Sequence, residues 1–459
     1  MIRLFNAYFP TRTLLLTVTE ALLVTLGFCL AVFVWAGTPL DANIYLLYEN
    51  GLGRIGLIVG VFLILMYYFD LYDSFVLGNR REVITRLVGV LGCAFVALAL
   101  LYYIFPEVSL VGSSLWLGVA IVAVAVPAWR NLFFVLNRSA RFSERAIIYG
   151  DGPLADPLMR EISHRAELGV RVVGFVGQSA PSVPGIPQLE GEIDDLAERQ
   201  NVQRIVVTMA DRRGRLPVEQ LLKLKTRGVY IQDGPEYYEN VTGKIPLESL
   251  HLSWLLFSPG FHVRAALRVY KRLFSLVLSA VAIVITAPLM VLAAIAIRLD
   301  SRGPAIFRQQ RVGEHGRMFT VYKFRSMYKG SEKQQLTPAE QDDVRVTRVG
   351  KWLRRLRIDE LPQLFNILKG DMAFVGPRPF VPEQEQECAE RIPFYRERWL
   401  VKPGATGWAQ INRGYNATLE DNREKLAYDL FYIKNMSFGL DLYVMFATLK
   451  ILLLGRGGR

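Results

Sequence analysis

The sequence predicts a membrane protein of mixed α and α/β structure in three parts: a four-helix transmembrane bundle at 1–140, a Rossmann-like, doubly wound α/β domain at 141–262, and a largely helical domain at 263–459. Three observations predict this fold class. Apolar residues make up 52% of the chain and charged residues only 21%, which is unusual for a soluble protein. Four long apolar segments fill the first third of the chain. Short strands alternating with helices follow them, and then comes a fifth apolar run.

Each of the first four apolar segments is long enough to cross a bilayer, because about 20 helical residues cross about 30 Å of hydrocarbon. The segments are Leu14–Ala36, Leu52–Phe69, Leu87–Phe105 and Leu110–Ala128. Arginines precede the first segment, lie between the second and third, and follow the fourth. The positive-inside rule therefore predicts that both ends of the bundle face the cytoplasm.

The chain carries a net charge of +12, which suits nucleic acid, anionic lipid headgroups or phosphorylated substrates. The apolar segments favour the last two, so we expect a lipid bilayer as a partner and no nucleic acid. Cys29, Cys93 and Cys388 are too far apart to suggest a disulfide framework or a zinc site.

The fifth apolar run, Leu273–Ile297, differs from the others because basic residues crowd both of its ends. A spanning helix would place one of these clusters on the wrong side of the membrane. Pro288 lies near the middle of the run and follows Thr286-Ala287, a combination that breaks a helix and lets a hydroxyl satisfy a freed carbonyl. We therefore expect a re-entrant helix broken at Pro288, with a fifth spanning helix as the alternative.

The middle of the chain has the alternating pattern of a parallel, doubly wound sheet, and its strands are expected at Arg145–Tyr149, Val170–Val176, Arg204–Met209 and Val229–Gln232. The turn Gly150–Ala155 has the form G-x-G-x-x-A and could cradle a diphosphate. However, no acidic residue follows the second strand, and Pro153 removes a backbone donor. A structural or regulatory role is the favoured interpretation.

Asp359 and Glu360 are the leading catalytic candidates. Asp359–Leu368 has the apolar spacing of a short amphipathic helix, and Pro362 is tolerated only in a first turn. An N-cap and a helix-dipole partner would explain one acidic residue, but not two. Two adjacent carboxylates just after several arginines suit a magnesium–diphosphate site, in which both carboxylates are metal candidates. A carboxylate can also attack phosphorus.

Basic residues that could bind phosphate lie on either side of this pair. The segment Gly376–Pro379 contains Pro377, Arg378 and a second proline, so it predicts a rigid loop that presents one guanidinium. Lys323 and Arg325 lie beside an apolar strand rich in Tyr and Phe. Each of these charges alone is more often a solvated or lipid-facing group.

Taken together and in this order, these motifs resemble the monotopic phosphoglycosyl transferases, or bacterial sugar transferases, over about Val269–Lys450. The bundle and the Rossmann-like domain resemble the long form of that family. The resemblance implies that Asp359 attacks the sugar-bearing phosphorus of a UDP-sugar and releases UMP, with Mg²⁺ as cofactor. Undecaprenyl phosphate then takes the phosphosugar at the cytoplasmic face of the bacterial inner membrane, which begins exopolysaccharide or other glycoconjugate synthesis.

The resemblance also assigns roles to other residues. Glu360 is similar to the second member of the catalytic dyad, and Lys323, Arg378 and Asp429 match family positions around the site. Arg413 corresponds to another such position, although Asn412-Arg413-Gly414 departs from the commoner Asn-Gly-Arg order. Pro288 matches the family's re-entrant break. A homodimer formed through the bundle and the middle domain is compatible with this organisation.

Two other functions remain as alternatives. A membrane-bound nucleotide-sugar dehydratase can share this kind of N-terminal half, but it would need a Tyr-x-x-x-Lys pair, which the chain lacks. An inactive scaffold of polysaccharide assembly would not need Asp359 and Glu360.

Overall fold

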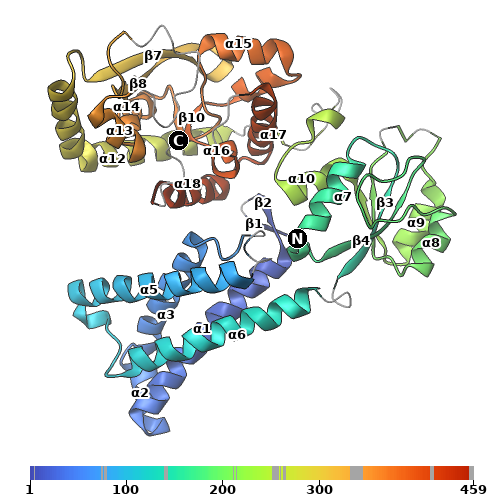
Figure 1. Cartoon of the computed structure of the whole chain (residues 1–459), viewed down its shortest axis with the longest axis horizontal. Coiled ribbons are helices and arrows are strands. Elements are labelled where there is room, and N and C mark those ends of the chain that lie inside the picture. The colour runs from blue at the N-terminus through green and yellow to red at the C-terminus, as the bar shows by residue number, and fades with distance from the viewer. Residues whose placement is uncertain are drawn as a thin grey trace. The chain divides into compact units, whose positions relative to one another are not determined.

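The computed structural model describes residues 1–4, 6–73, 76, 80–138, 143–209, 211–212, 214–250, 258, 260–261, 265–330, 345–413 and 418–453 (Figure 1). Internal contacts divide the chain into two compact units. The first comprises Met1–Ile2 and Phe9–Tyr237, and the second comprises Arg3–Tyr8 and Tyr238–Arg459. A short hairpin of β1 (Ile2–Leu4) and β2 (Ala7–Phe9) therefore belongs largely to the second unit.

The four predicted apolar segments form long helices. They are α1 (Thr11–Ala36), α3 (Gly51–Tyr68), α5 (Arg80–Ile104) and α6 (Ser114–Arg138), and all four are long and apolar enough to cross a membrane. A short helix that the sequence analysis did not expect, α2 (Pro39–Tyr48), lies between the first two. The hydroxyl of Thr38 accepts a hydrogen bond from the Asp41 amide at 3.2 Å, and Pro39 takes the first helical position. These two features are ordinary helix-start signals.

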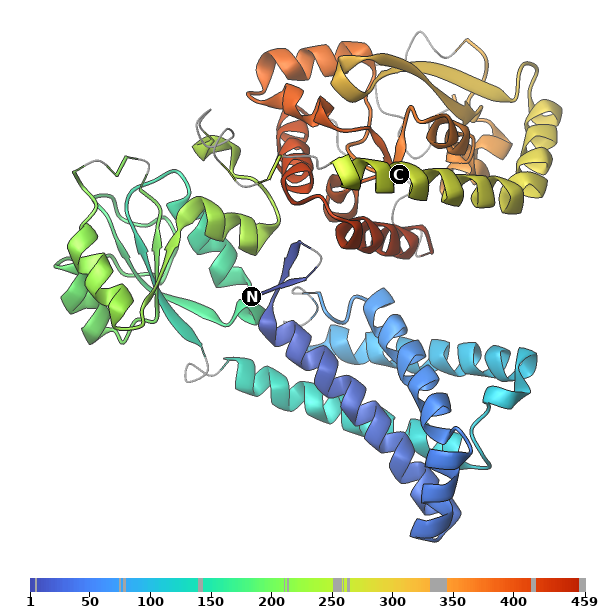
Figure 2. The same ribbon diagram turned by 180° about the vertical axis from the view of Figure 1, so that it is seen from behind.

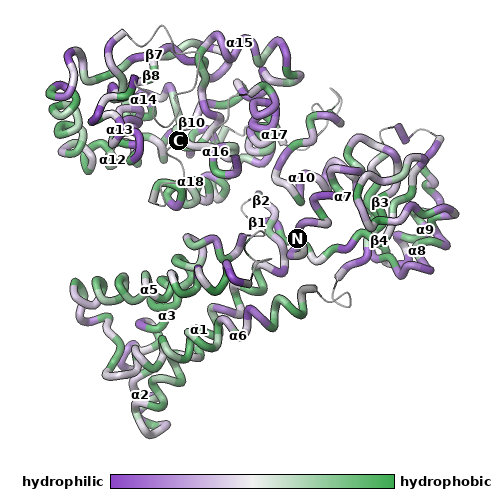
Figure 3. The backbone as a smooth tube through the Cα atoms, viewed as in Figure 1, coloured by the Kyte–Doolittle hydropathy of each residue, from purple (hydrophilic) through white to green (hydrophobic). Residues whose placement is uncertain are grey.

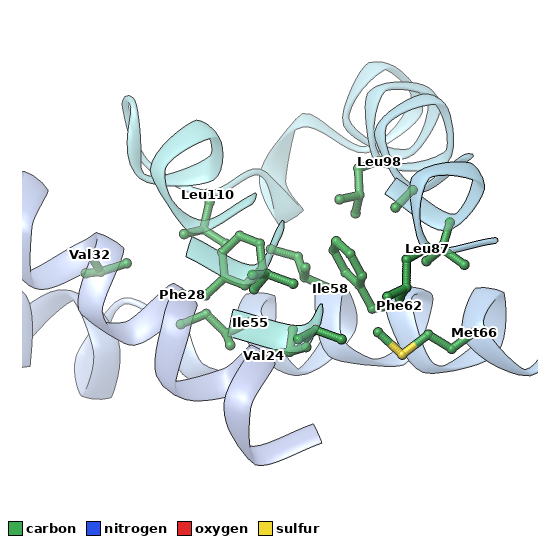
Figure 4. Close-up of a cluster of buried hydrophobic side chains, with 14 of the residues drawn as sticks. Val24, Phe28, Val32, Ile55, Ile58, Phe62, Met66, Leu87, Leu98 and Leu110 are labelled. Atoms are coloured by element: carbon green, nitrogen blue, oxygen red, sulfur yellow. The ribbon is translucent and has the colours of Figure 1, made fainter. Parts of the chain in front are cut away.

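One apolar core joins these helices. Figure 4 shows Phe28 of α1, Ile58 and Phe62 of α3, and Leu87 and Leu98 of α5 packed in it. Many of the other large apolar side chains are exposed, which matches the predominantly hydrophobic colouring of these helices in Figure 3. A helix that is apolar on every side is typical of a protein core or of a membrane span.

A buried ion pair lies inside the bundle. Arg130 on α6 contacts Glu20 on α1 at 2.5 Å, and Tyr72 donates to the other Glu20 oxygen at 2.8 Å. Arg130 also donates to the Leu71 carbonyl at 2.8 Å. Pairing of this kind is what allows ionisable side chains to remain among apolar helices.

The middle of the chain forms a four-stranded parallel sheet in the order β4-β3-β5-β6. The strands are β3 (Glu144–Tyr149), β4 (Val170–Val176), β5 (Arg204–Val207) and β6 (Tyr230–Asp233), close to their expected positions. Helices α8 (Ile193–Arg199) and α9 (Val218–Thr226) cover one face, and α7 (Ala155–His164) and α10 (Gly234–Thr242) lie on the other (Figure 2). The doubly wound α/β arrangement predicted from the sequence is therefore observed.

The second unit is largely helical, with two small sheets. Its elements up to residue 369 are α12 (Ala265–Asp300), the antiparallel hairpin of β7 (Ile306–Val312) and β8 (Met318–Phe324), α13 (Arg348–Arg355), the 3₁₀ turn η7 (Ile358–Glu360) and α14 (Gln363–Lys369). The remaining elements are β9 (Ala373–Val375), α15 (Pro382–Arg391), η8 (Tyr395–Leu400), β10 (Gly404–Thr406), α16 (Trp408–Asn412), α17 (Leu419–Asn435) and α18 (Phe438–Leu453). Strands β9 and β10 pair in parallel.

Helix α12 contains the fifth apolar run, and Pro288 lies inside it. Its ribbon changes direction within its length in Figures 1 and 2. Strand β8 shares apolar clusters with both halves of the helix: Val321 belongs to a cluster with Ile283, and Phe324 belongs to one with Met290 and Ile297. Both halves of α12 therefore lie against the same folded unit.

Candidate active site

The two acidic candidates lie in a 3₁₀ turn just before α14 rather than within that helix. Arg357 precedes the turn with φ 55°, a left-handed conformation that is uncommon for residues other than glycine. Glu360 continues the turn, and Pro362 leads into α14. Asn366 of α14 fixes this element against β8, since its side chain accepts from the Tyr322 amide at 3.0 Å and donates to the Thr320 carbonyl at 2.7 Å.

Three cations contact Glu360, two of them from distant parts of the chain and one from three residues upstream. Its Oε1 lies 2.9 Å from Arg378, 3.2 Å from Lys323 on β8 and 3.5 Å from Arg357. Asp359 is arranged differently, because its Oδ1 is buried without a hydrogen-bond partner among the described residues. One carboxylate is thus held by cations while the other keeps an oxygen available.

This asymmetry separates the pKa values of the two carboxyl groups. Burial and the neighbouring Glu360 raise the pKa of Asp359 to about 6. Burial acts in the same direction on Glu360, but Lys323, Arg378 and Arg357 outweigh it and hold the pKa of Glu360 well below its usual range. Near pH 7 both groups are ionised, and Asp359 is the more basic of the two, as a nucleophile requires.

The predicted rigid loop that contains Arg378 is present, and backbone hydrogen bonds hold it in place. Gly376 donates to the Thr406 carbonyl and Gly404 donates to the Pro377 carbonyl, both at 2.9 Å. A Cβ at Gly376 would collide with the Lys402 carbonyl, so only glycine allows this close approach of the two chain segments. The loop therefore presents Arg378 to Glu360 from a fixed backbone.

Arg325 has a different position from the other predicted basic residues. Its guanidinium is buried and donates to the carbonyls of Ser301 at 2.7 Å and Arg302 at 3.0 Å. It also donates to the Ser301 hydroxyl at 2.9 Å. These bonds satisfy carbonyls at the C-terminal end of α12, so the structure gives Arg325 a helix-capping role.

Asp429 and Arg413 form ion pairs with residues other than Glu360. Asp429 is buried and contacts Arg398 at 3.0 Å, and burial raises its pKa to about 6 despite that partner. Arg413 binds Asp421 at 3.1 Å and Glu424 at 2.8 Å on the first turns of α17.

Arg311 is a basic residue near the site that the sequence analysis did not select. It lies on β7 and donates to the Pro379 carbonyl at 3.2 Å. Burial and the nearby charge of Arg378 lower its pKa to about 10. This crowding of cations leaves the site with more positive than negative charge, which favours a phosphorylated ligand.

The residues around Asp359 fit a magnesium ion that is held mainly by substrate. No group of three or more His, Cys, Asp or Glu side chains could hold a metal within the described ranges. Magnesium typically binds one or two carboxylates together with substrate phosphate oxygens. The unpaired Oδ1 of Asp359 suits that role better than Glu360, whose Oε1 already contacts three cations.

Comparison with known proteins decides the family. A family described as bacterial sugar transferase matches residues 266–455, and one described as a CoA-binding domain matches residues 67–225. A UDP-glucose:undecaprenyl-phosphate glucose-1-phosphate transferase from Xanthomonas campestris pv. campestris is 31% identical over 416 residues, covering 83% of this chain and 82% of that protein. The chain belongs to the bacterial sugar transferase family.

Two other relatives match this chain over shorter regions. A UDP-N-acetylgalactosamine-undecaprenyl-phosphate N-acetylgalactosaminephosphotransferase from Aeromonas hydrophila is 45% identical over 228 residues, 48% of this chain and 52% of that protein. An undecaprenyl-phosphate glucose phosphotransferase from Komagataeibacter xylinus is 37% identical over 331 residues, 68% of this chain and 59% of that protein. The match thus spans only about half to three fifths of these two relatives.

The glycine turn of the middle domain contains an acidic side chain and is covered by an apolar one. The Asp151 carboxylate lies in the glycine turn and accepts from the amides of Gln178 and Ser179. The Gly150 carbonyl accepts from the Thr208 hydroxyl at 2.6 Å, and Met209 packs directly over Gly150. A carboxylate at this position disfavours a diphosphate there, and the structural or regulatory role of the domain stays a prediction.

Proposed function

We propose that this sugar transferase moves a sugar 1-phosphate from a UDP-sugar to undecaprenyl phosphate and releases UMP. The observation that carries the proposal is the paired site at Asp359 and Glu360. It combines a buried carboxylate oxygen that has no hydrogen-bond partner among the described residues with a neighbouring carboxylate that contacts Lys323, Arg357 and Arg378. The names of the relatives support the same reaction, since they describe transfer of sugar phosphates to undecaprenyl phosphate.

In the first step, an oxygen of Asp359 attacks the phosphorus that carries the sugar. The bond from that phosphorus to the bridging oxygen breaks, and its electron pair leaves with UMP. The product is an acyl-phosphate between Asp359 and the phosphosugar. Arg378 and Lys323 lie where they can neutralise phosphate charge as it develops.

In the second step, a phosphate oxygen of undecaprenyl phosphate attacks the same phosphorus. The bond to Asp359 breaks, so the carboxylate is regenerated and the lipid carries a sugar diphosphate. Glu360 contacts three cations, and its role is to orient them. Asp359 is therefore the carboxylate that attacks phosphorus. Magnesium, when bound at Asp359, would supply further neutralisation of the substrate phosphates.

The test is the release of UMP by the full-length protein in lipid nanodiscs with undecaprenyl phosphate and magnesium. UDP-glucose, UDP-galactose and UDP-N-acetylgalactosamine form the first panel. We expect UMP release that depends on the lipid phosphate for at least one of them. An NAD-dependent change in the free UDP-sugar would indicate the dehydratase, and no conversion of any UDP-sugar would favour the inactive scaffold.

We also propose that α12 enters and leaves the membrane on the cytoplasmic side. Near its start, Arg272 donates to the carbonyls of Ile367 and Leu368, both at 2.9 Å. Near its end, Ile297 is buried in the core of the same unit. Between them, Val284 and Ile285 are 74% and 71% exposed, as lipid-facing residues would be. A spanning helix would carry one end to the opposite side of the bilayer.

Single cysteines at positions 268 and 302 test this topology. In a chain whose Cys29, Cys93 and Cys388 are replaced by alanine, Arg268→Cys and Arg302→Cys should react with a membrane-impermeant maleimide from the cytoplasmic side. Both residues are exposed and flank the apolar run of α12. Labelling of the two positions from opposite sides would contradict the re-entrant arrangement and support a fifth spanning helix.

A further inference from the structure

Arg398 occupies a buried charge network directly behind the loop that presents Arg378. Its side chain is only 3% exposed. One guanidinium nitrogen contacts Glu385 of α15 at 3.1 Å. The other contacts Asp429 of α17 at 3.0 Å and donates to the Arg378 carbonyl at 2.9 Å. Arg398 thus joins two helices to one backbone position of the loop.

The same network holds the loop at a second point. Glu385 accepts a hydrogen bond from the Phe380 amide at 3.2 Å, and the Arg398 guanidinium lies 4.8 Å from the centre of the Phe380 ring. Prolines at 377 and 379 have no amide hydrogen, so few backbone donors remain to fix this segment. The bonds from Arg398 and to Glu385 therefore hold the backbone on either side of Pro379.

We propose that Arg398 is a positioning residue that sets the Arg378 guanidinium against Glu360 by holding the Arg378 carbonyl. The inference rests on the proposed sugar-phosphate transfer, in which Arg378 neutralises phosphate. Glu385 and Asp429 compensate the charge of Arg398, and its planar guanidinium still has an N–H that binds the Arg378 carbonyl. A lysine keeps the charge but presents a single nitrogen, so it cannot reach all three partners in the same geometry.

If Arg398 only stabilised the fold, its substitution would affect activity in a different way. An ion network that only stabilises the fold lowers activity by the same factor whether or not Arg378 is present. A positioning residue acts through Arg378, so its effect disappears when that side chain is removed. Loss of positioning also lowers kcat more than it raises KM, because a displacement of about 1 Å can cost about 100-fold in rate.

The experiment is a double-mutant cycle in the full-length protein, with Arg398→Lys and Arg378→Ala alone and combined. We expect Arg398→Lys to lower kcat about 30-fold and to change the KM for the UDP-sugar less than about 3-fold. In the Arg378→Ala background the same substitution should cost less than about 3-fold. Equal factors in both backgrounds would overturn the inference. Arg391→Lys is the matched control, because Arg391 is 62% exposed and pairs only with Glu387 among the described residues.

Hydrogen exchange gives a readout that does not require activity. In Arg398→Lys, the Phe380 amide, which donates to Glu385, should exchange about 10-fold faster, while peptides from α1 are unchanged. Unchanged protection at this amide would overturn the inference. If Arg398→Lys does not fold, Glu385→Gln replaces it in both measurements, because it weakens the same network without removing Arg398. Wild-type protein that releases no UMP would reject the proposed function, and hydrogen exchange would still decide whether Arg398 holds the loop.

Discussion

Asp359→Asn is expected to lower sugar-phosphate transfer by at least about 10⁴-fold, because an amide cannot form the acyl-phosphate. The wild-type protein incubated with radiolabelled UDP-sugar in the absence of undecaprenyl phosphate should carry label on the protein after rapid acid quenching. The variant should carry none. Turnover at the wild-type rate would refute the nucleophile assignment. Glu390→Gln serves as the control, since Glu390 is an exposed carboxylate on α15.

The same variant should unfold at a higher temperature than the wild type at pH 8. The folded-state pKa of Asp359 is about 6, above the ordinary value of 3.8, so the ionised group opposes folding at high pH. Its favourable contribution is present below pH 3.8 and is lost as pH rises through about 6. We expect Asp359→Asn to gain up to about 3 kcal/mol at pH 8 and less at pH 5. A loss of stability at both pH values would show that Asp359 has a structural role.

Glu360→Gln is expected to lower kcat about 10³-fold by releasing the cations that it holds. Lys323, Arg357 and Arg378 all contact its Oε1 in the wild type, at 3.2, 3.5 and 2.9 Å. Removal of its charge also takes away one cause of the raised Asp359 pKa. The acid limb of the kcat profile, expected near pH 6 in the wild type, should therefore move to lower pH.

The stability of Glu360→Gln separates it from Asp359→Asn. The lowered pKa of Glu360 stabilises the fold above its ordinary value of 4.5, and that contribution is lost only on acidification. Removing one partner of a buried charge network leaves the others uncompensated. Glu360→Gln should thus unfold at a lower temperature than the wild type at pH 7. An unshifted acid limb together with unchanged stability would contradict the arrangement at Glu360.

Local sequence patterns located the main elements because those patterns have local physical causes. The length of each apolar run corresponds to a long helix, and the parallel strands of the middle domain lie within a few residues of their expected ends. The short helix α2 was missed although Thr38 and Pro39 signal its start, because the run around it was interpreted only by its hydropathy. The start of α14 was also displaced, since a 3₁₀ turn precedes it.

The candidate site could be predicted in part for the same reason. Asp359, Glu360, Lys323 and Arg378 belong to compact motifs, and the structure brings all but Asp359 into direct contact. Arg325 lies only two residues beyond Lys323, yet it caps the end of α12. Residues two apart in a strand share a face, but β8 ends at Phe324, so Arg325 lies beyond the strand and its partners come from the segment after α12.

The sequence by itself determined the long apolar helices and the doubly wound sheet, and it predicted the acidic pair as the place of chemistry, because hydrophobic length, periodicity and adjacent charges are short-range properties. Only the tertiary structure decided which cations hold Glu360 and that Arg398 lies behind Arg378. Lys323 is 37 residues from Glu360 in the chain, and Arg398 is 31 residues from Asp429. Arg398 belongs to no motif that the sequence analysis singled out. Its environment is made by the packing of α15, η8 and α17 against the loop.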